Sequence, residues 1–231
     1  MESFNKFRSA CDTEEGWPLV FEDKKKNIAV YQQASKDSNI NIVKMRAVLN
    51  VPASVLYDVL HDADYRKAWD ENMDEGYCIQ QIDSHNDVGY YSAKSPFFGV
   101  SGRDFCNQRS WWRKEDGSEY IIHNHSVIHK DCPEKKQYVR AWSHMTGYMI
   151  RPNTDGTCTM VYLTQTDLRG WIPAWAINQG ASKFAPGIVD KLTRVGPQYN
   201  DWKQKNNADH KPWLVTAPYV WEQTTETTTE Q

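Results

Sequence analysis

A run of six strand-like segments between residues 75 and 167 constrains the fold of this chain more than any other feature. The segments are residues 75–83, 88–95, 104–114, 120–129, 138–150 and 157–167. Asn, Asp, Gly and Pro stand between them, and these residues favour turns because they tolerate or impose unusual backbone angles. Consecutive strands joined by short turns pair antiparallel, and a sheet of this size twists. We therefore expect one strongly curved antiparallel sheet.

Shorter elements are expected before this run. Apolar residues recur at spacings of three and four in residues 2–14, which is typical of a helix. The expected strands are residues 17–22, 28–33 and 41–49. In the third strand, alternate residues from Val43 to Leu49 are apolar, so this face should turn toward the core. Pro52 fits the first turn of a helix, where its missing N–H costs nothing, and residues 65–70 add a further helical turn.

The last predicted element is one long helix that begins at Pro173. Its apolar residues fall at spacings of three and four and form a continuous face. They are Phe184, Ile188, Leu192, Val195, Tyr199 and Trp202. Gly180 and Gly187 should weaken this helix and are candidate hinges. Residues 1–215 are expected to form a single domain, followed by a disordered polar tail over residues 216–231.

The predicted layout is α+β, with a curved antiparallel sheet around a long amphipathic C-terminal helix. Such an arrangement encloses space, and a small closed sheet holds a ligand when side chains leave that space open. Enclosure therefore favours a binding function.

The composition excludes several classes of protein. Lys and Arg number 27 against 30 Asp and Glu, so the formal charge of −3 provides no basic excess for nucleic-acid binding. No stretch approaches the roughly 18 apolar residues of a membrane span, and the first residues lack a signal-peptide pattern. The five cysteines are scattered without the spacing of a zinc or redox motif. These features predict free thiols in a reducing cytoplasm. We also expect the protein to be a monomer.

Sequence motifs for catalysis are absent. There is no G-x-S-x-G, no H-E-x-x-H and no glycine-rich phosphate loop. His123, His125 and His129 alternate on one predicted strand face, but no carboxylate or cysteine joins them at matching parity. Exposed or hydrogen-bonded histidines are therefore expected rather than a metal site. We expect no metal, no cofactor and no enzymatic activity.

Arg66 and Asp70 are four residues apart in a predicted helical segment rich in aromatic residues, so they can share one helix face. Two interpretations are open. In one, they form a surface salt bridge worth less than about 1 kcal/mol. In the other, they point into a cavity, where Asp70 holds the guanidinium and Arg66 binds an anion bidentately. Arg103 and Asp104 pose the same question, and for them a structural ion pair at a strand start is favoured.

Several ordered motifs mark the chain. They are Tyr65-Arg66-Lys67-Ala68-Trp69-Asp70, Gly102-Arg103-Asp104-Phe105, Gln108-Arg109-Ser110-Trp111 and Ile172-Pro173-Ala174-Trp175. Together they resemble the START lipid-transfer domains, in the phosphatidylcholine-transfer subgroup, over about residues 15–215. The resemblance implies a helix-grip fold, in which a curved antiparallel sheet holds a lipid in a hydrophobic tunnel under a C-terminal helix lid.

The resemblance also implies a phospholipid site. The head-group positions are Arg66, Asp70, Tyr91, Phe105, Trp142 and His144. The supporting positions are Arg103 and Tyr148, and the lid hinges are Gly180 and Gly187. Arg66 would meet the lipid phosphate, with Asp70 as its acidic partner, because a phosphate buried without a cation would cost several kcal/mol.

Three aromatic side chains, those of Tyr91, Phe105 and Trp142, would form a cage for choline, since a quaternary ammonium binds aromatic faces. Phe105 stands where the subgroup's phosphatidylcholine carrier has Tyr, and His144 where it has Gln. A primary ammonium needs hydrogen-bond acceptors, which Asp70 or neutral His144 could supply. Ethanolamine lipid is therefore expected beside choline lipid.

We thus expect a non-enzymatic carrier that binds one phospholipid, phosphatidylcholine or phosphatidylethanolamine, and transfers it between membranes by transient surface contact. The loop over residues 95–102, with Phe97 and Phe98, is a candidate for membrane insertion, and ordinary core packing is the alternative. Three other functions remain open. They are a carrier of sterol or ceramide, an enzyme acting on a hydrophobic substrate within the same fold, and an adaptor whose lipid is only structural.

Overall fold

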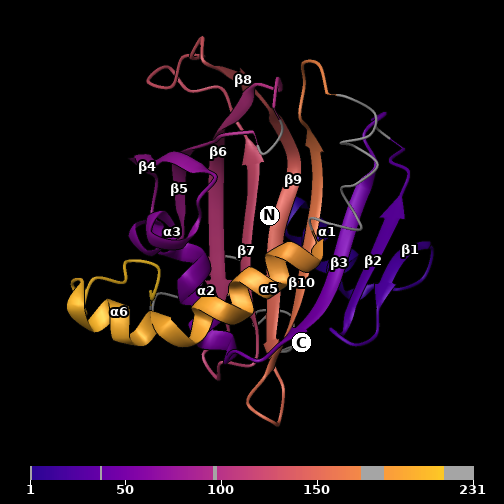
Figure 1. Ribbon diagram of the computed structural model, residues 1–231, viewed down its shortest axis with the longest axis vertical. Helices are drawn as coiled ribbons and strands as arrows, with labels where there is room; N and C mark the ends of the chain where they lie inside the picture. The colour runs from indigo at the N-terminus through magenta and orange to yellow at the C-terminus, as the bar shows by residue number, and fades with distance from the viewer. Residues whose placement is uncertain (1, 37, 96–97, 173–184, 216–231) are drawn as a thin grey trace, which may run out of the picture.

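A ten-stranded, largely antiparallel sheet forms the body of the protein (Figure 1). The computed structural model describes residues 2–36, 38–95, 98–172 and 185–215. The strands are β1 (Leu19–Asp23), β2 (Ile28–Gln33), β3 (Ile42–Leu49), β4 (Met73–Gln81), β5 (Asn86–Ala93), β6 (Gly102–Arg113), β7 (Tyr120–Ser126), β8 (Tyr138–Arg140), β9 (Trp142–Pro152) and β10 (Cys158–Asp167). The helices are α1 (Glu2–Asp12), α2 (Ala53–His61), α3 (Ala63–Trp69), α5 (Ala185–Val195), the 3-10 turn η2 (Gly196–Gln198) and α6 (Tyr199–Lys205).

The strand order is β1-β2-β3-β10-β9-β7-β6-β5-β4, so the first three strands join the others through the antiparallel pairing of β3 with β10. The short strand β8 stands off this path and pairs in parallel with β6. Helix α5 crosses one face of the sheet, and α1 lies behind the sheet in the same view (Figure 1). The expected α+β architecture, a curved antiparallel sheet with a C-terminal helix across it, is confirmed.

Both faces of the sheet are covered, because residues along a strand alternate between them. In β10, Met160 belongs to the apolar cluster that includes α2 and α5, and Val161 belongs to the cluster that includes α1. We call the α5 side the inner face and the α1 side the outer face. None of the helices in the described ranges is long and apolar enough to cross a membrane.

The apolar face of β3 turns inward as expected, since alternate residues from Met45 to Leu49 are buried in the inner cluster. The opposite face is also covered. Lys44 lies buried beneath α1, and its ammonium donates to the carbonyl of Ala10 at 3.2 Å and to that of Thr13. The last carbonyls of a helix have no intrahelical partner, so Lys44 fixes the end of α1 to the sheet. Burial lowers the pKa of this lysine.

Residues 138–150 form two strands, where the sequence predicted one. The N–H of Ala141 donates to the carbonyl of Asp104 in β6 at 3.0 Å, so the chain stays attached to β6 through β8. From Trp142 onward it pairs with β10 instead. The connection over residues 127–137 is longer than a turn, which allows β8 to run parallel to β6.

The C-terminal helix is interrupted within the described residues. Helix α5 ends at Val195, the turn η2 follows, and α6 begins at Tyr199. Pro197 lacks the N–H that a continuous α-helix uses, and a Cβ on Gly196 would lie 2.7 Å from the side chain of Val51. The expected unbroken helix is therefore wrong in this stretch.

The predicted hinge Gly187 lies inside α5, and its role as a hinge stays a prediction. Other expectations fall outside the described residues. They are the helix start at Pro173, the hinge Gly180, Phe97 and the disordered tail over residues 216–231.

A buried ion pair fixes α6 to the corner between α2 and α3. Asp62 is the N-cap of α3, where one carboxylate oxygen accepts from two backbone N–H groups. Its other oxygen accepts from the hydroxyl of Tyr199 at 3.1 Å and from the ammonium of Lys203 at 2.9 Å. The hydroxyl of Tyr65 donates to the carbonyl of Val195 at 2.6 Å. These contacts fix the end of α5 and so hold that helix across the inner face.

Candidate functional site

Arg66 and Asp70 share one face of α3, as their spacing predicts. The Nε of Arg66 donates to Oδ2 of Asp70 at 3.2 Å, and the hydroxyl of Tyr91 from β5 donates to the same oxygen at 3.4 Å. The helix ends at this point because its C-cap, Asp70, has an extended backbone, with φ −94° and ψ 90°. The guanidinium therefore stands between α3 and β5.

This ion pair is partly buried. The side chain of Arg66 is 31% exposed and that of Asp70 is 10% exposed. Burial opposes the charge of Arg66, but Tyr91, Tyr148 and Asp70 outweigh it and raise the pKa of the guanidinium. The pair is thus partly buried rather than a fully exposed surface salt bridge, and its place in a cavity stays a prediction.

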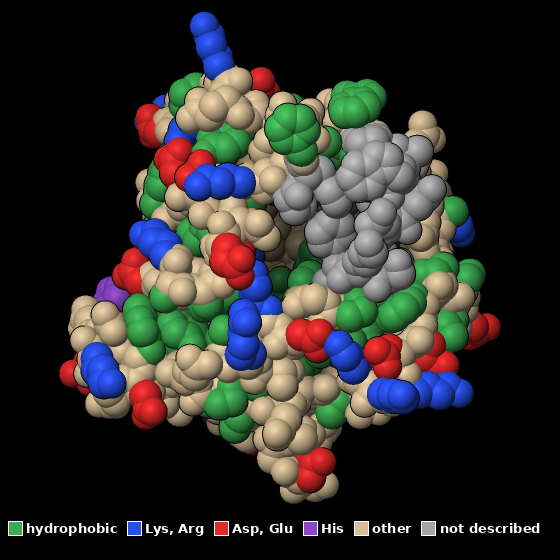
Figure 2. Space-filling view, viewed as in Figure 1, with side chains coloured by type: hydrophobic (Ala, Val, Ile, Leu, Met, Phe, Trp, Pro, Cys, Tyr) green, Lys and Arg blue, Asp and Glu red, His purple; other side chains and the backbone are tan. Residues whose placement is uncertain are grey.

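Two aromatic side chains of the sheet stand near Arg66. Tyr148 of β9 and Tyr162 of β10 pack with ring centroids 4.9 Å apart, and burial raises the pKa of both hydroxyls. Both side chains keep some accessible surface. Figure 2 shows a recess on this face of the molecule, just above α5.

Aromatic rings stand beside the guanidinium. Tyr91 and Phe105 are cross-strand partners on β5 and β6, and their ring centroids are 6.3 Å apart. The guanidinium carbon of Arg66 lies 4.8 Å from the centroid of the Tyr91 ring. Of the predicted site residues, the structure brings together Arg66, Asp70, Tyr91, Phe105 and Tyr148.

Trp142 and His144 are not placed with this group. The ring of Trp142 lies 5.4 Å from the guanidinium carbon of Arg169, in the segment after β10. His144 is exposed at the point where the register of β9 against β10 shifts, between Ser143 and Met145. It is an extra residue in a bulge, which changes the direction of side chains along the strand. The head-group roles of Trp142 and His144 stay predictions.

Arg103 and Asp104 do not pair with each other, because successive residues of a strand point to opposite faces. Asp104 is buried and pairs with Arg140, with Nη2 and Oδ2 3.0 Å apart. Arg103 donates to the carbonyl of Leu168 at 3.0 Å and to that of Arg169 at 2.7 Å. The favoured mutual ion pair is therefore wrong, and Arg103 instead holds the segment after β10 against β6.

Two further groups at the inner face were not anticipated from the sequence. Arg109 of β6 lies opposite Asp87 of β5 and donates to it through Nε at 2.7 Å. Trp111 belongs to the inner cluster, so Arg109, two residues earlier, shares that face. Lys191 of α5 reaches toward Asp70, with Nζ and Oδ1 3.9 Å apart. These pairs join distant segments, and no local sequence pattern marks them.

The three histidines that were expected on one strand face are divided. His123 and His125 lie on the outer face with ring centroids 6.0 Å apart, and burial together with His125 lowers the pKa of His123 to about 4. His129 lies beyond β7, and its Nε2 is hydrogen-bonded to Gln80 at 2.8 Å. Within the ranges that the structure describes, no three His, Cys, Asp or Glu side chains are grouped to hold a metal ion.

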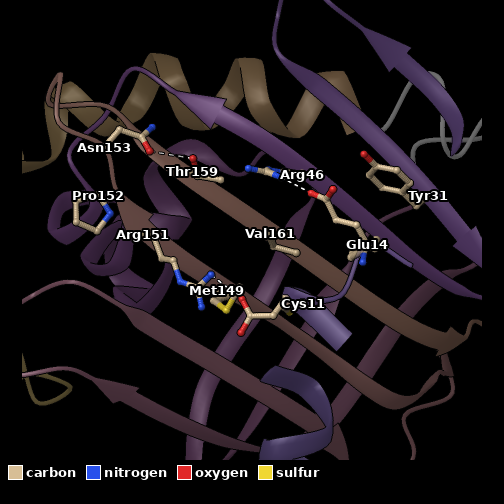
Figure 3. A pocket seen from close by; sticks show the side chains of 12 residues that line it. Cys11, Glu14, Tyr31, Arg46, Met149, Arg151, Pro152, Asn153, Thr159 and Val161 are labelled. Carbon is tan, nitrogen blue, oxygen red and sulfur yellow. Dashed lines mark hydrogen bonds and ion pairs between the residues drawn. The ribbon is translucent and has the colours of Figure 1, made fainter. Parts of the chain in front are cut away.

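A cavity of about 300 Å³ lies on the outer face beside α1 (Figure 3). Four of its five charged side chains form ion pairs with one another, and the fifth, Lys44, donates to backbone carbonyls. Arg46 contacts Glu14 at 2.5 Å, and Arg151 contacts Asp12 at 2.6 Å. Arg66 and Arg46 each contact a carboxylate through one nitrogen, but the side chain of Arg66 is less exposed, at 31% against 52%. An anion at the inner site would therefore meet a guanidinium that is less screened by water.

Comparisons with known proteins agree with this geometry. The family model described as "START domain" matches residues 3–201. START domain-containing protein 10 of Mus musculus is 40% identical over 215 residues, which are 92% of this chain and 72% of that protein. Phosphatidylcholine transfer protein of Mus musculus is 26% identical over 209 residues, which are 86% of this chain and 95% of that protein.

The solved structures include a close match in three dimensions. The crystal structure of human STARD10 superposes with a TM-score of 0.83 at 39% identity, covering 92% of this chain and 86% of that chain. The region matched by the family model contains the whole sheet, the Arg66 group on α3 and helix α5 above them. By sequence and by fold, the chain belongs to the START domain family.

Proposed function

We propose that the protein binds one phospholipid within its sheet and carries it between membranes without making or breaking a covalent bond. The observation that supports this most is the partly buried guanidinium of Arg66 on the inner face, which contacts Asp70 through Nε alone. A phosphate taken out of water needs a cation, and a guanidinium matches two phosphate oxygens at once. The name of the similar phosphatidylcholine transfer protein is consistent with this ligand.

The acyl chains would lie along the inner face beneath α5. Each methylene that leaves a bilayer loses about 0.8 kcal/mol unless it finds an equally apolar surface. The inner face would supply such a surface from its partly buried residues, such as Tyr148, Tyr162 and Ile188. We propose that a hydrophobic tunnel for the acyl chains runs along this inner face.

For the head group we propose phosphatidylcholine and, in addition, phosphatidylethanolamine. The rings of Tyr91 and Phe105 stand beside Arg66, where a quaternary ammonium next to a bound phosphate could contact aromatic faces. The Asp70 carboxylate in the same group could accept hydrogen bonds from a primary ammonium. We propose that Trp142 and His144 contact the head group only after a bound lipid has changed their positions.

Replacing Phe105 by leucine should weaken choline lipid more than ethanolamine lipid. Leucine keeps the apolar surface but removes the aromatic face, which contributes about 0.5–2 kcal/mol to binding of a quaternary ammonium. Competition between the two lipids for the purified variant measures the change in preference. Phe105→Tyr is the control, because it keeps the ring and should keep the wild-type preference. Equal losses for both lipids would argue against an aromatic contact with choline.

The proposed membrane contact is an apolar tip formed by two loops. Phe98 in the β5–β6 loop and Trp171 after β10 are both exposed, so core packing does not account for Phe98. Arg103 joins the two loops, because its guanidinium donates to the carbonyls of Ser101 and Leu168. Exposed aromatic side chains favour the boundary between water and lipid. We therefore propose that this tip docks on the bilayer.

The double variant Phe98→Ser/Trp171→Ser should bind vesicles at least about tenfold more weakly, since two large apolar contacts with lipid are lost. Co-sedimentation with phosphatidylcholine vesicles measures the binding. Ile128→Ser is a matched control, because Ile128 is equally exposed but lies in the separate β7–β8 connection. If the control lost as much binding as the double variant, the tip would not be the docking surface.

A transfer assay with fluorescent lipids separates the proposed ligand from the alternatives. Donor and acceptor vesicles would be mixed with the protein and with labelled phosphatidylcholine, phosphatidylethanolamine, cholesterol or ceramide. Transfer of the two phospholipids is expected, because only they present a phosphate to Arg66. Transfer of sterol or ceramide alone would overturn the proposal. Residence in the cytoplasm and the monomeric state stay predictions.

A further inference from the structure

Lys191 is the only lysine of α5, and its ammonium stands close to the Arg66 group without bonding to it. Its Nζ lies 3.9 Å from Oδ1 of Asp70 and 3.8 Å from Oε1 of Glu71. Both distances exceed the usual range for hydrogen bonds from an ammonium. The side chain is only 22% exposed. Lys191 is thus a half-buried cation that makes no hydrogen bond within the described part of the chain.

Other lysines that touch the C-terminal helices behave differently. Lys26 lies 2.6 Å from Asp190, Lys203 lies 2.9 Å from Asp62, and Lys211 lies 2.6 Å from Asp58. Each of these ammonium groups reaches hydrogen-bond distance of a carboxylate. A partly desolvated charge without such a bond is costly, so the position of Lys191 favours the arrival of another acceptor.

Arg66 and Lys191 stand on the two sides of one carboxylate. Arg66 contacts Oδ2 of Asp70, and Lys191 lies nearest to Oδ1. Both cations are 5.8 Å from the centroid of the Trp69 ring. Two positive charges therefore face one buried negative charge, since the carboxylate of Glu71 is mostly in water. One excess positive charge matches the single negative charge of a phosphodiester.

We propose that Lys191 is a second phosphate-binding residue, so that the lipid phosphate is held between α3 and α5. This inference rests on the proposed function and adds a consequence for release. Because α5 carries Lys191, the bound phosphate stabilises α5 in its place across the inner face. Contacts from both helices thereby retain the phospholipid, so the bound head group lowers the rate at which the lipid is released.

The test measures release of fluorescent phosphatidylcholine from the loaded full-length protein into excess acceptor vesicles. Lys191→Gln should release the lipid roughly tenfold faster, the usual effect of losing one charge-assisted hydrogen bond. Lys191→Arg keeps the charge and should restore slow release. Arg194→Gln removes a positive charge from an exposed position of the same helix and should release lipid at the wild-type rate.

The thermal unfolding temperature of the lipid-free variants provides the structural control. Lys191→Gln should not lower it, because the lipid-free protein has no hydrogen bond to lose there. Release from Lys191→Gln at the wild-type rate, or failure of Lys191→Arg to restore slow release, would overturn the role of Lys191. If wild-type protein took up no phospholipid, the proposed function itself would fail, and the two results are distinguishable.

Discussion

Replacing Arg66 by alanine is expected to lower phospholipid transfer about a hundredfold or more while leaving the protein folded. A phosphate buried without its guanidinium loses at least about 3 kcal/mol of stabilisation, and each 1.4 kcal/mol is a factor of ten in affinity. The fold should survive because Asp70 still accepts the hydrogen bond from the hydroxyl of Tyr91 and still lies near the ammonium of Lys191. Initial rates of fluorescent phosphatidylcholine transfer between vesicles measure the effect.

Two further variants sharpen this experiment. Lys67→Ala removes the neighbouring cation, which is exposed and lies 3.4 Å from Asp64, and should transfer lipid normally. Arg66→Lys keeps the charge but loses the planar fork, so its transfer rate should fall between those of wild type and Arg66→Ala. Normal transfer by Arg66→Ala would show that the phosphate binds elsewhere.

Replacing Asp62 by alanine is expected to destabilise the protein by about 3–5 kcal/mol, because the buried ammonium of Lys203 loses its counter-charge. The same change removes the cap of α3 and the acceptor of the Tyr199 hydroxyl. Urea unfolding followed by tryptophan fluorescence gives the free energy of unfolding.

Asp64→Ala is the matched control for this variant. The side chain of Asp64 lies in the same helix but is mostly in water, where its contact with Lys67 is worth well under about 1 kcal/mol. A loss of less than about 1 kcal/mol for Asp62→Ala would mean that this ion pair does not hold α6 to the corner between α2 and α3.

Much of the sheet could be predicted from sequence because strand and turn patterns are local. Turn residues separate the strand-like segments between residues 75 and 167, and β3 shows its inner face directly in the alternation of residues 43–49. The division between β8 and β9 could not be predicted in this way. It depends on the hydrogen bond from Ala141 to Asp104, and this bond joins segments far apart in the chain.

For the long C-terminal helix, a local pattern led to a wrong prediction. Its apolar spacing continues from Ile188 to Trp202, so periodicity alone predicts one element. Pro197 and Gly196 interrupt it, and the local signal for this break was present in the sequence but was outweighed by the periodicity. The close approach of Gly196 to Val51 is tertiary and had no local signal.

Some residues of the candidate site could be predicted from the sequence, and others could not. The spacing of Arg66 and Asp70 marked their shared helix face, and the family resemblance pointed to Tyr91 and Phe105, which the sheet register brings together. The resemblance also pointed to His144, which is exposed in the bulge of β9 and is not placed with this group. Lys191 comes to the site only because α5 crosses the sheet, so no pattern in its own segment marks it.

Native mass spectrometry of the protein as purified from cells tests the phospholipid site most directly. The wild-type chain is expected to carry one phospholipid per molecule, released as intact phosphatidylcholine or phosphatidylethanolamine on activation in the gas phase, and Arg66→Ala is expected to lose it. A wild-type chain that carries only sterol, or that carries phospholipid equally well with and without Arg66, would contradict a phosphate site at this guanidinium.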